Sequence, residues 1–317
     1  MKIGNLYDLE SFKAFADSAK QKGFSDAYAG TILARSLTHV NATVFEKKYQ
    51  ELAFVNSGIT ADNTGGYAQQ IQSKRLIELG GFTNSADDSA NKGKISLAGE
   101  QSFLKVVQRE ASSDWSDTEI KQAAIEGVNL PSQYVATHNK IYMREVDEIG
   151  LLGVNGVNGL LNNSAFVSGA ASGAIGTLTA QQMYDEVASV IVDQRNAVNN
   201  TPEYSCNKVV MPVTVMNTLQ ITMLNTANGS STVLKALRDN FPDVAFETSF
   251  RAASVGGSSA TVAYSTSSDA MIMRIPQALT IGEIVKKGSF DFHVDSKYRI
   301  AGLDVLEATS GRILTGL

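Results

Sequence analysis

The feature that most constrains the fold is a long extended segment near the C-terminal end, residues 290–306. In its first half, apolar and polar side chains alternate with the period of a half-buried strand: Phe290, Phe292 and Val294 against Asp291, His293 and Asp295. Gly302 interrupts the apolar positions of the second half, which indicates a bend or bulge. No comparable strand precedes the segment at hairpin spacing. We therefore expect it to pair with a strand distant in sequence and to close a sheet begun earlier.

The charge balance argues against a dedicated nucleic-acid-binding protein. The chain has 317 residues, 27 basic and 32 acidic, and a net charge of -5. A nucleic-acid-binding protein would carry clusters of basic residues. Cys206 is the single cysteine, so an intrachain disulfide and a thiolate metal cluster are both excluded. We interpret Cys206 as a half-buried, unreactive thiol.

The N-terminus has no hydrophobic core of a signal peptide, and no window approaches the apolar length of a membrane span. We expect synthesis in the cytoplasm and no membrane partner. Further along, Leu9, Phe12, Phe15, Ala16 and Ala19 share one helical face. Residues 26–38 are a second candidate helix. Both precede any recognisable core, so they could form an arm that lies on another subunit, with Phe12 and Phe15 as candidate interface residues.

Residues 67–108 predict a long hairpin. Two moderately apolar flanks enclose the polar, turn-rich stretch GGFTNSADDSANKGK. A two-stranded ribbon is marginal in water and needs a neighbour to lie on. Arg75, Phe82 and Lys94 flank the tip and are candidate subunit-interface residues. An ordinary surface excursion of a large sheet is the alternative.

Two capping patterns mark helix starts. Ser116 and Glu119 form a capping-box pair, and Thr179 and Gln182 form another. Between them, residues 131–152 carry one apolar stripe and predict a helix roughly 33 Å long. The glycines that follow it match no phosphate-binding pattern, and we predict irregular turns leading into a strand.

From residue 179 onward, helices and strands alternate, which favours a compact α/β or α+β domain. We predict a buried strand at residues 208–213, a helix capped by Thr214 and a helix capped by Ser231. Residues 244–248 predict a short strand, and residues 261–264 and 271–275 a hairpin.

The sequence carries no recognisable motif for catalysis or for metal or cofactor binding. His39, His138 and His293 are far apart and form no ligand pair, and the chain has no GxSxG motif. The adjacent acids Asp147 and Glu148 are predicted to lie on solvated helix faces. We predict no catalytic residue, no cofactor and no metal, although an α/β enzyme with an unrecognised site remains the alternative from another class.

Five short segments carry a resemblance to known proteins. The stretch MRIPQALT at residues 273–280 and RIAGLDV at 299–305 resemble the major capsid proteins of tailed phages and prophages. GLLNN at 159–163, VMP at 210–212 and TVL at 232–234 follow the same order. The resemblance covers most of the chain from about residue 115.

The resemblance implies an α+β capsid fold of the Hong Kong ninety-seven type, which encapsulins share. The implied parts are an N-terminal arm (1–60), an extended loop or β-ribbon (61–112), a peripheral domain with a spine helix (113–176 and 277–317) and an axial domain (177–276). The implied function is self-assembly into hexamers and pentamers that form an icosahedral head shell around double-stranded DNA, without sequence-specific binding. Portal, scaffold and decoration or cement proteins are the implied partners. An encapsulin-like cargo compartment is the runner-up.

Overall fold

The computed structural model describes residues 52–83, 93–125, 127–154, 156–226 and 229–317. The described residues all belong to one compact unit, Tyr49–Leu317. The two predicted arm helices, with Phe12 and Phe15, lie outside the described residues. Among the described helices, none is long and apolar enough to cross a membrane.

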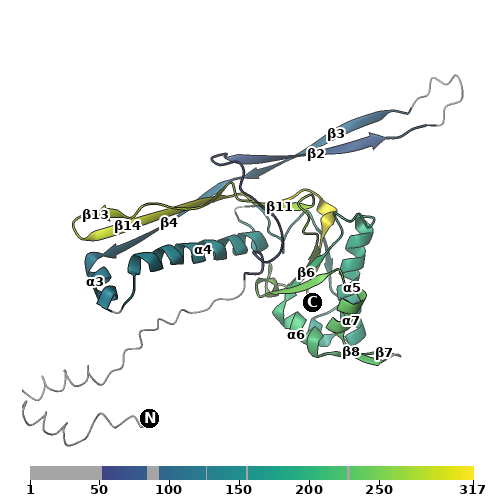
Figure 1. The fold of residues 1–317 in the computed structure, drawn as a ribbon. Coiled ribbons are helices and arrows are strands. Elements are labelled where there is room, and N and C mark those ends of the chain that lie inside the picture. The colour runs from purple at the N-terminus through teal and green to yellow at the C-terminus, as the bar shows by residue number, and fades with distance from the viewer. Residues whose placement is uncertain (1–51, 84–92, 126, 155, 227–228) are drawn as a thin grey trace, which may run out of the picture. The chain divides into compact units, whose positions relative to one another are not determined.

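The long C-terminal segment does pair with a strand far away in sequence, as predicted. β14 (Asp291–Ile300) runs antiparallel to β4 (Val107–Ser116) over ten residue pairs, from Asp291 opposite Ser116 to Ile300 opposite Val107. Two short strands that the sequence did not predict, β12 (Gln277–Ile281) and β13 (Val285–Lys287), pair with its other edge. Figure 1 shows this sheet alongside helix α4.

Gly302 is the point at which the segment changes sheets. Its φ of +92° lies in the left-handed region that favours glycine. After it, β15 (Gly302–Val305) pairs with β11 (Met271–Arg274), which also pairs in parallel with β1 (Ala61–Asp62). The predicted bend is therefore confirmed.

One face of the β4–β14 sheet packs on α4 (Leu130–Leu152), the predicted long helix. The Asn129 side chain caps α4, and Trp115 stacks on Tyr134 with ring centroids 4.8 Å apart. The buried His138 ring lies 2.8 Å from the Ser113 hydroxyl and 2.6 Å from that of Ser296. The preceding helix α3 (Asp117–Ile125) begins with the predicted capping box, since Ser116 and Glu119 exchange backbone-to-side-chain hydrogen bonds.

A second layer contains a five-stranded sheet and three helices. The strand order is β5 (Val167–Ala170), β16 (Gly311–Thr315), β10 (Ala260–Tyr264), β6 (Lys208–Pro212) and β9 (Ala245–Ser249). Apolar side chains of α5 (Ala180–Ala197), α6 (Val213–Ile221) and α7 (Val233–Asn240) form one buried cluster with this sheet. The remaining short elements are η1 (Ile175–Thr177), β7 (Met223–Thr226), β8 (Gly229–Thr232), η2 (Arg251–Ala253) and η3 (Ala308–Ser310).

Several local predictions are wrong. β10 and β11 do not form a hairpin, because β10 lies between β6 and β16 while β11 lies between β1 and β15. Helix α6 follows Pro212 without a side-chain cap, and Thr232 rather than Ser231 caps α7. Cys206 is fully buried, and burial raises the pKa of its thiol. The Thr179–Gln182 capping box of α5 is confirmed.

Asp147 is also a correction, since it is buried rather than solvated. Its carboxylate accepts a 2.6 Å hydrogen bond from the Phe54 N–H and lies 3.6 Å from Arg251. Burial raises the pKa of Asp147, although both contacts act to lower it. Two partners from distant segments meet this side chain, and sequence periodicity alone does not reveal them.

Gly159 lies in one of the capsid-like segments, where the chain turns back on α4. A substitution at this position tests how closely the two segments pack. A Cβ at this position would lie 2.3 Å from the Leu151 carbonyl carbon and 2.4 Å from its oxygen. We expect Gly159→Ala to lower the free energy of unfolding by about 3 kcal/mol or more, measured by urea denaturation. Gly176→Ala is the matched control, because its Cβ would meet nothing within 4 Å. Equal midpoints for the two variants would contradict the packing argument.

His293 lies between two carboxylates on the sheet face that points away from α4, and a substitution there tests whether these contacts stabilise the fold. Its Nδ1 lies 2.5 Å from Asp114 and its Nε2 lies 2.8 Å from Asp295. The hydrogen bond with Asp114, followed by that with Asp295, raises the pKa of His293 above its ordinary value of 6.5. A raised folded-state pKa means that this stabilisation is fully present below about pH 6.5 and is lost as the pH rises through the folded-state pKa.

We therefore expect the stability difference between the wild type and His293→Gln to be largest near pH 6 and to shrink towards pH 8, followed by urea denaturation across that range. Lys286→Gln, at a neighbouring strand position with a group that stays charged, is the control and should give a difference independent of pH. A pH-independent effect of His293→Gln would contradict the assignment.

Candidate subunit interface

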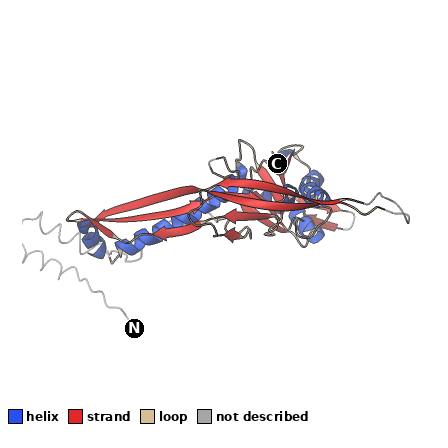
Figure 2. Ribbon diagram, turned by 90° about the horizontal axis from the view of Figure 1, so that it is seen from above, coloured by secondary structure: helices blue, strands red, loops and turns tan. Residues whose placement is uncertain are grey.

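The predicted hairpin exists as a two-stranded ribbon. β2 (Gln70–Gly80) and β3 (Ile95–Lys105) pair antiparallel at eleven positions, from Gln70 opposite Lys105 to Gly80 opposite Ile95. They form a two-stranded sheet of their own. Figure 2 shows the two strands side by side. The tip, residues 84–92, lies outside the described residues.

The strand register sorts the ribbon side chains onto two faces. Directly opposite residues of an antiparallel pair point to the same side, and positions alternate along each strand. Ser73 and Arg75 therefore share one face, which we call the inner face. Lys74, Leu76 and Glu78 share the other, the outer face.

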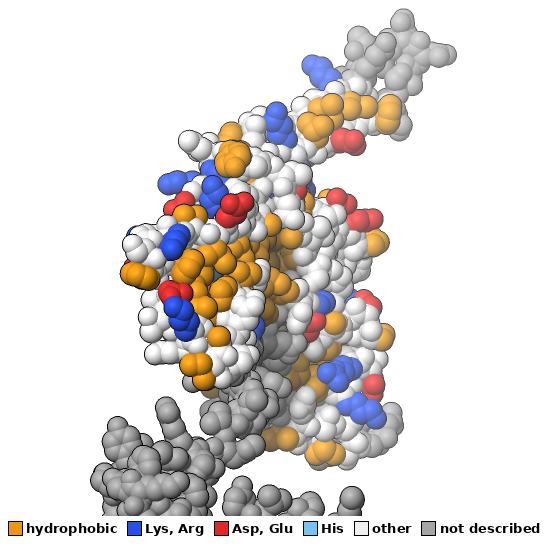
Figure 3. Space-filling model, turned by 60° about the vertical axis from the view of Figure 1, so that its left-hand side comes forward, with side chains coloured by type: hydrophobic (Ala, Val, Ile, Leu, Met, Phe, Trp, Pro, Cys, Tyr) orange, Lys and Arg blue, Asp and Glu red, His pale blue; other side chains and the backbone are white. Residues whose placement is uncertain are grey.

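The outer face carries an apolar stripe of four large, exposed side chains. They are Leu76 (73% exposed), Leu97 (68%), Ile95 (62%) and Phe103 (61%). Polar residues lie between them, and Gln72 donates a 2.7 Å hydrogen bond to Gln101 across the strands. In Figure 3, hydrophobic side chains follow the ribbon between charged ones. Exposed apolar side chains concentrated on one face are typical of a protein–protein contact surface.

The inner face contacts the C-terminal part of the chain through polar groups. The Ser73 hydroxyl donates to Asp304, at the end of β15, and the Arg75 guanidinium pairs with Glu307. Arg75 also donates to the Leu306 carbonyl at 3.4 Å. A cavity of about 280 Å³ lies beside these contacts, lined in part by Ser102, Val305 and Leu306.

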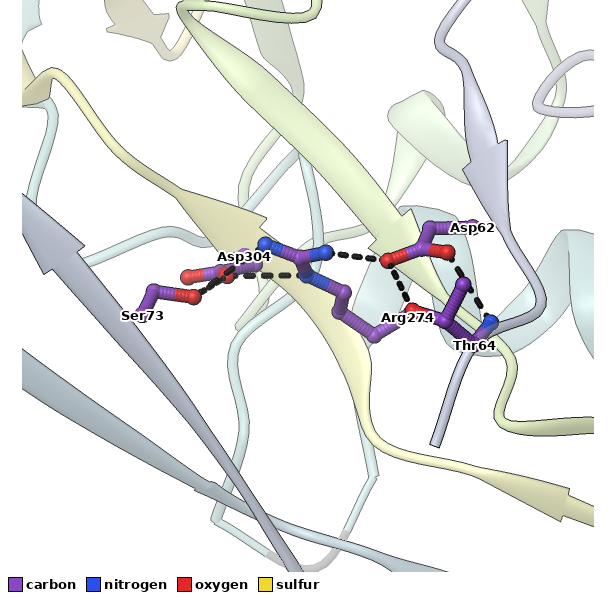
Figure 4. A network of polar contacts seen from close by, with 5 residues as sticks. All are labelled: Asp62, Thr64, Ser73, Arg274 and Asp304. Carbon is purple, nitrogen blue, oxygen red and sulfur yellow. Dashed lines mark hydrogen bonds and ion pairs between the residues drawn. The ribbon is translucent and has the colours of Figure 1, made fainter. Parts of the chain in front are cut away.

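A charged network connects the base of the ribbon with three other strands (Figure 4). Arg274 of β11 pairs with Asp62 of β1 and, at 3.1 Å, with the buried Asp304 of β15. It also donates to the Ser73 hydroxyl of β2 at 3.2 Å. Burial acts to raise the pKa of Asp62, but hydrogen bonds from Thr64 and Arg274 lower it below its usual value. Charged hydrogen-bond networks of this kind hold their members in one relative arrangement.

The five predicted interface residues have different locations. Arg75 is not beside the tip, since it lies mid-strand on the inner face and pairs within its own chain. Phe82 is 96% exposed and Lys94 is exposed, and both adjoin the tip segment. Phe12 and Phe15 lie outside the described residues. The sequence did not predict the apolar stripe: Ile95, Leu97 and Phe103 share one face of β3 through the two-residue period of a strand, but only the observed register places Leu76 beside them.

Polar side chains between α4 and the sheet pair with one another, as His138 does with Ser113 and Ser296. Within the described ranges, no group of three His, Cys, Asp or Glu residues could hold a metal ion. The cavity between α4 and the sheet, about 270 Å³, includes His138, Glu145 and Tyr298. Glu145 and Tyr298 are hydrogen-bonded to each other, and burial, followed by this hydrogen bond, raises the pKa of the Tyr298 hydroxyl.

Comparisons with known proteins found a matching family model and similar solved structures. The family model described as Major capsid protein matches residues 81–316. A chain from the capsid of Myoviridae phage XM1 is 41% identical, with a TM-score of 0.80, and the match covers 90% of this chain and 98% of that one. No curated protein matches the chain.

More distant structures share the fold. A capsid chain of a native GTA particle is 12% identical with a TM-score of 0.67, covering 88% of this chain and 95% of that one. A chain from Mycobacterium phage Che8 is 15% identical with a TM-score of 0.59, covering 87% and 96%. The α+β fold is therefore of the Hong Kong ninety-seven type, as the sequence resemblance implied. Because the family model covers most of the chain and the phage XM1 capsid is 41% identical, this chain belongs to the major capsid protein family and is a structural protein of a phage head shell rather than an enzyme.

Proposed function

We propose that copies of this chain form hexamers and pentamers through heterologous contacts that close into an icosahedral shell around double-stranded DNA. The proposed contact between subunits rests on one observation, the apolar stripe on the outer face of the ribbon. Around Ser73 and Arg75, the inner face contacts the chain's own C-terminal segment. The outer face therefore remains for a neighbouring subunit, where burial would stabilise the contact by about 1.5–3 kcal/mol for each large apolar side chain.

We propose the four-part division with two adjusted boundaries. The sequence-based division assigns residues 1–60 to the arm, 61–112 to the extended loop, 113–176 and 277–317 to the peripheral domain and 177–276 to the axial domain. The pairing of β4 with β14 supports beginning the peripheral domain at Val107. The position of β16 beside β10 supports grouping the last strand with the axial sheet.

Further contacts and partners belong to the same proposal. Phe12 and Phe15 of the arm, with Phe82 and Lys94 beside the ribbon tip, contact neighbouring subunits. The shell assembles with portal, scaffold and decoration or cement proteins after synthesis in the host cytoplasm. The net charge of -5 supports enclosure of DNA without tight binding to the wall, because a strongly basic wall would bind phosphates by counterion release.

The double variant Leu76→Ser/Leu97→Ser tests the stripe. Both side chains are mostly exposed, so we expect little change in the unfolding midpoint of the subunit. We expect a large loss of shells, because the same apolar contact is removed from every subunit. Sedimentation velocity and electron microscopy measure this loss. Lys74→Ser/Glu78→Ser is the matched control, since it alters charged residues on the same face.

The outcomes separate the parts of the proposal. A wild-type protein that stays monomeric under all assembly conditions would contradict the self-assembly proposal. If the stripe variant assembles as well as the control, the stripe is not a subunit contact. Particles that enclose protein cargo instead of nuclease-protected DNA would favour the encapsulin-like alternative.

A further inference from the structure

The ribbon base is held by a small number of directional polar contacts. On the inner face, Arg75 reaches Glu307 and the Leu306 carbonyl, while Ser73 reaches Asp304. Beside them, the cavity of about 280 Å³ leaves space where apolar side chains could have packed. In a close-packed interface many weak contacts would determine the orientation of the ribbon. Around Ser73 and Arg75, the contacts between the ribbon and the C-terminal segment are hydrogen bonds and an ion pair.

The position of the Glu307 side chain is fixed by hydrogen bonds within its own turn, independently of Arg75. Its Oε1 accepts hydrogen bonds from the Thr309 hydroxyl at 2.7 Å and the Thr309 N–H at 3.3 Å, as the N-cap of η3. Its backbone carbonyl accepts from the Ser310 hydroxyl at 2.6 Å. The other carboxylate oxygen, Oε2, receives the guanidinium of Arg75. A short capped turn of the same chain therefore holds the acceptor in place.

Arg75 is suited to fix the ribbon relative to Glu307. A guanidinium is planar and donates from several N–H groups in a rigid fork, so two acceptors define its direction better than one. The two acceptors, Glu307 and the Leu306 carbonyl, are neighbours on the segment that follows β15. One residue farther along the strand, Leu76 lies on the opposite face and belongs to the apolar stripe. Any rotation of the ribbon at Arg75 would thus redirect the stripe.

We propose that Arg75 and Glu307 are positioning residues that set the direction of the ribbon and thereby determine where the apolar stripe is presented to a neighbouring subunit. Arg75 acts within its own chain and not as a direct subunit contact. The Ser73–Asp304 hydrogen bond, joined to Arg274, supplies a second point of attachment nearby. The effect on assembly rests on the proposed function, whereas the effect on ribbon direction does not.

The test measures ribbon direction in the unassembled subunit. Spin labels are attached at Ser96→Cys on β3 and Ser268→Cys before β11, two exposed positions, while the fully buried Cys206 is shielded from the reagent. Arg75→Met keeps an unbranched apolar stem but removes the guanidinium, and Glu307→Gln keeps the shape of the side chain without its charge. We expect a narrow distance distribution in the parent and a similarly broadened one in each variant. Adding the second substitution should cause little further change.

The same variants are then placed in assembly conditions. We expect several-fold fewer shells for Arg75→Met and for Glu307→Gln, with unchanged unfolding midpoints. Lys74→Met is the matched control, because Lys74 is the preceding residue on the outer face, and it should leave the distance distribution narrow.

The distance measurement and the assembly measurement contradict different parts of the proposal. Distance distributions in both variants that match the parent would overturn the positioning role. Broadened distributions with full shell yield would overturn the claim that ribbon direction controls presentation of the stripe. A wild type that forms no shell under any condition would instead contradict the proposed function, and the distance measurements would still decide the positioning role.

Discussion

The ten-residue pairing of β4 with β14 is the contact on which the rest of the subunit depends. It joins segments separated by nearly the whole second layer of the molecule, and it creates the sheet face that covers α4. Trp115, His138 and Tyr298 each find a partner between that sheet face and α4. Because the pairing is so distant in sequence, the intervening helices and the five-stranded sheet must fold so that both strands can meet.

Arg274 connects this framework to the ribbon. Its partners come from β1, β2 and β15, so one side chain relates the early part of the described chain to its final strands. A buried ion-pair network contributes little net stability compared with apolar packing. Its directional hydrogen bonds instead favour one arrangement among several that packing alone would allow.

The ribbon illustrates how a shell subunit differs from a protein that functions alone. Around Ser73 and Arg75 its inner face pairs with groups of its own chain, while its outer face exposes Leu76, Leu97, Ile95 and Phe103. A two-stranded sheet of this kind has little stability by itself. Contact with a neighbour would stabilise the ribbon and join subunits in the same step, which fits membership of the major capsid protein family.

Local signals in the sequence determined the long helix, both capping boxes, the ribbon and the need for a distant partner for β14. These features depend on periodicity and on backbone groups within a few residues, and short capsid-like segments such as that containing Gly159 identified the family. Only the tertiary structure decided that β4 is the partner, that β10 and β11 lie in different sheets, that Asp147 is buried and that Arg75 faces its own chain. Those outcomes depend on strand register and on contacts between residues far apart in sequence, where one chain offers no local pattern to read.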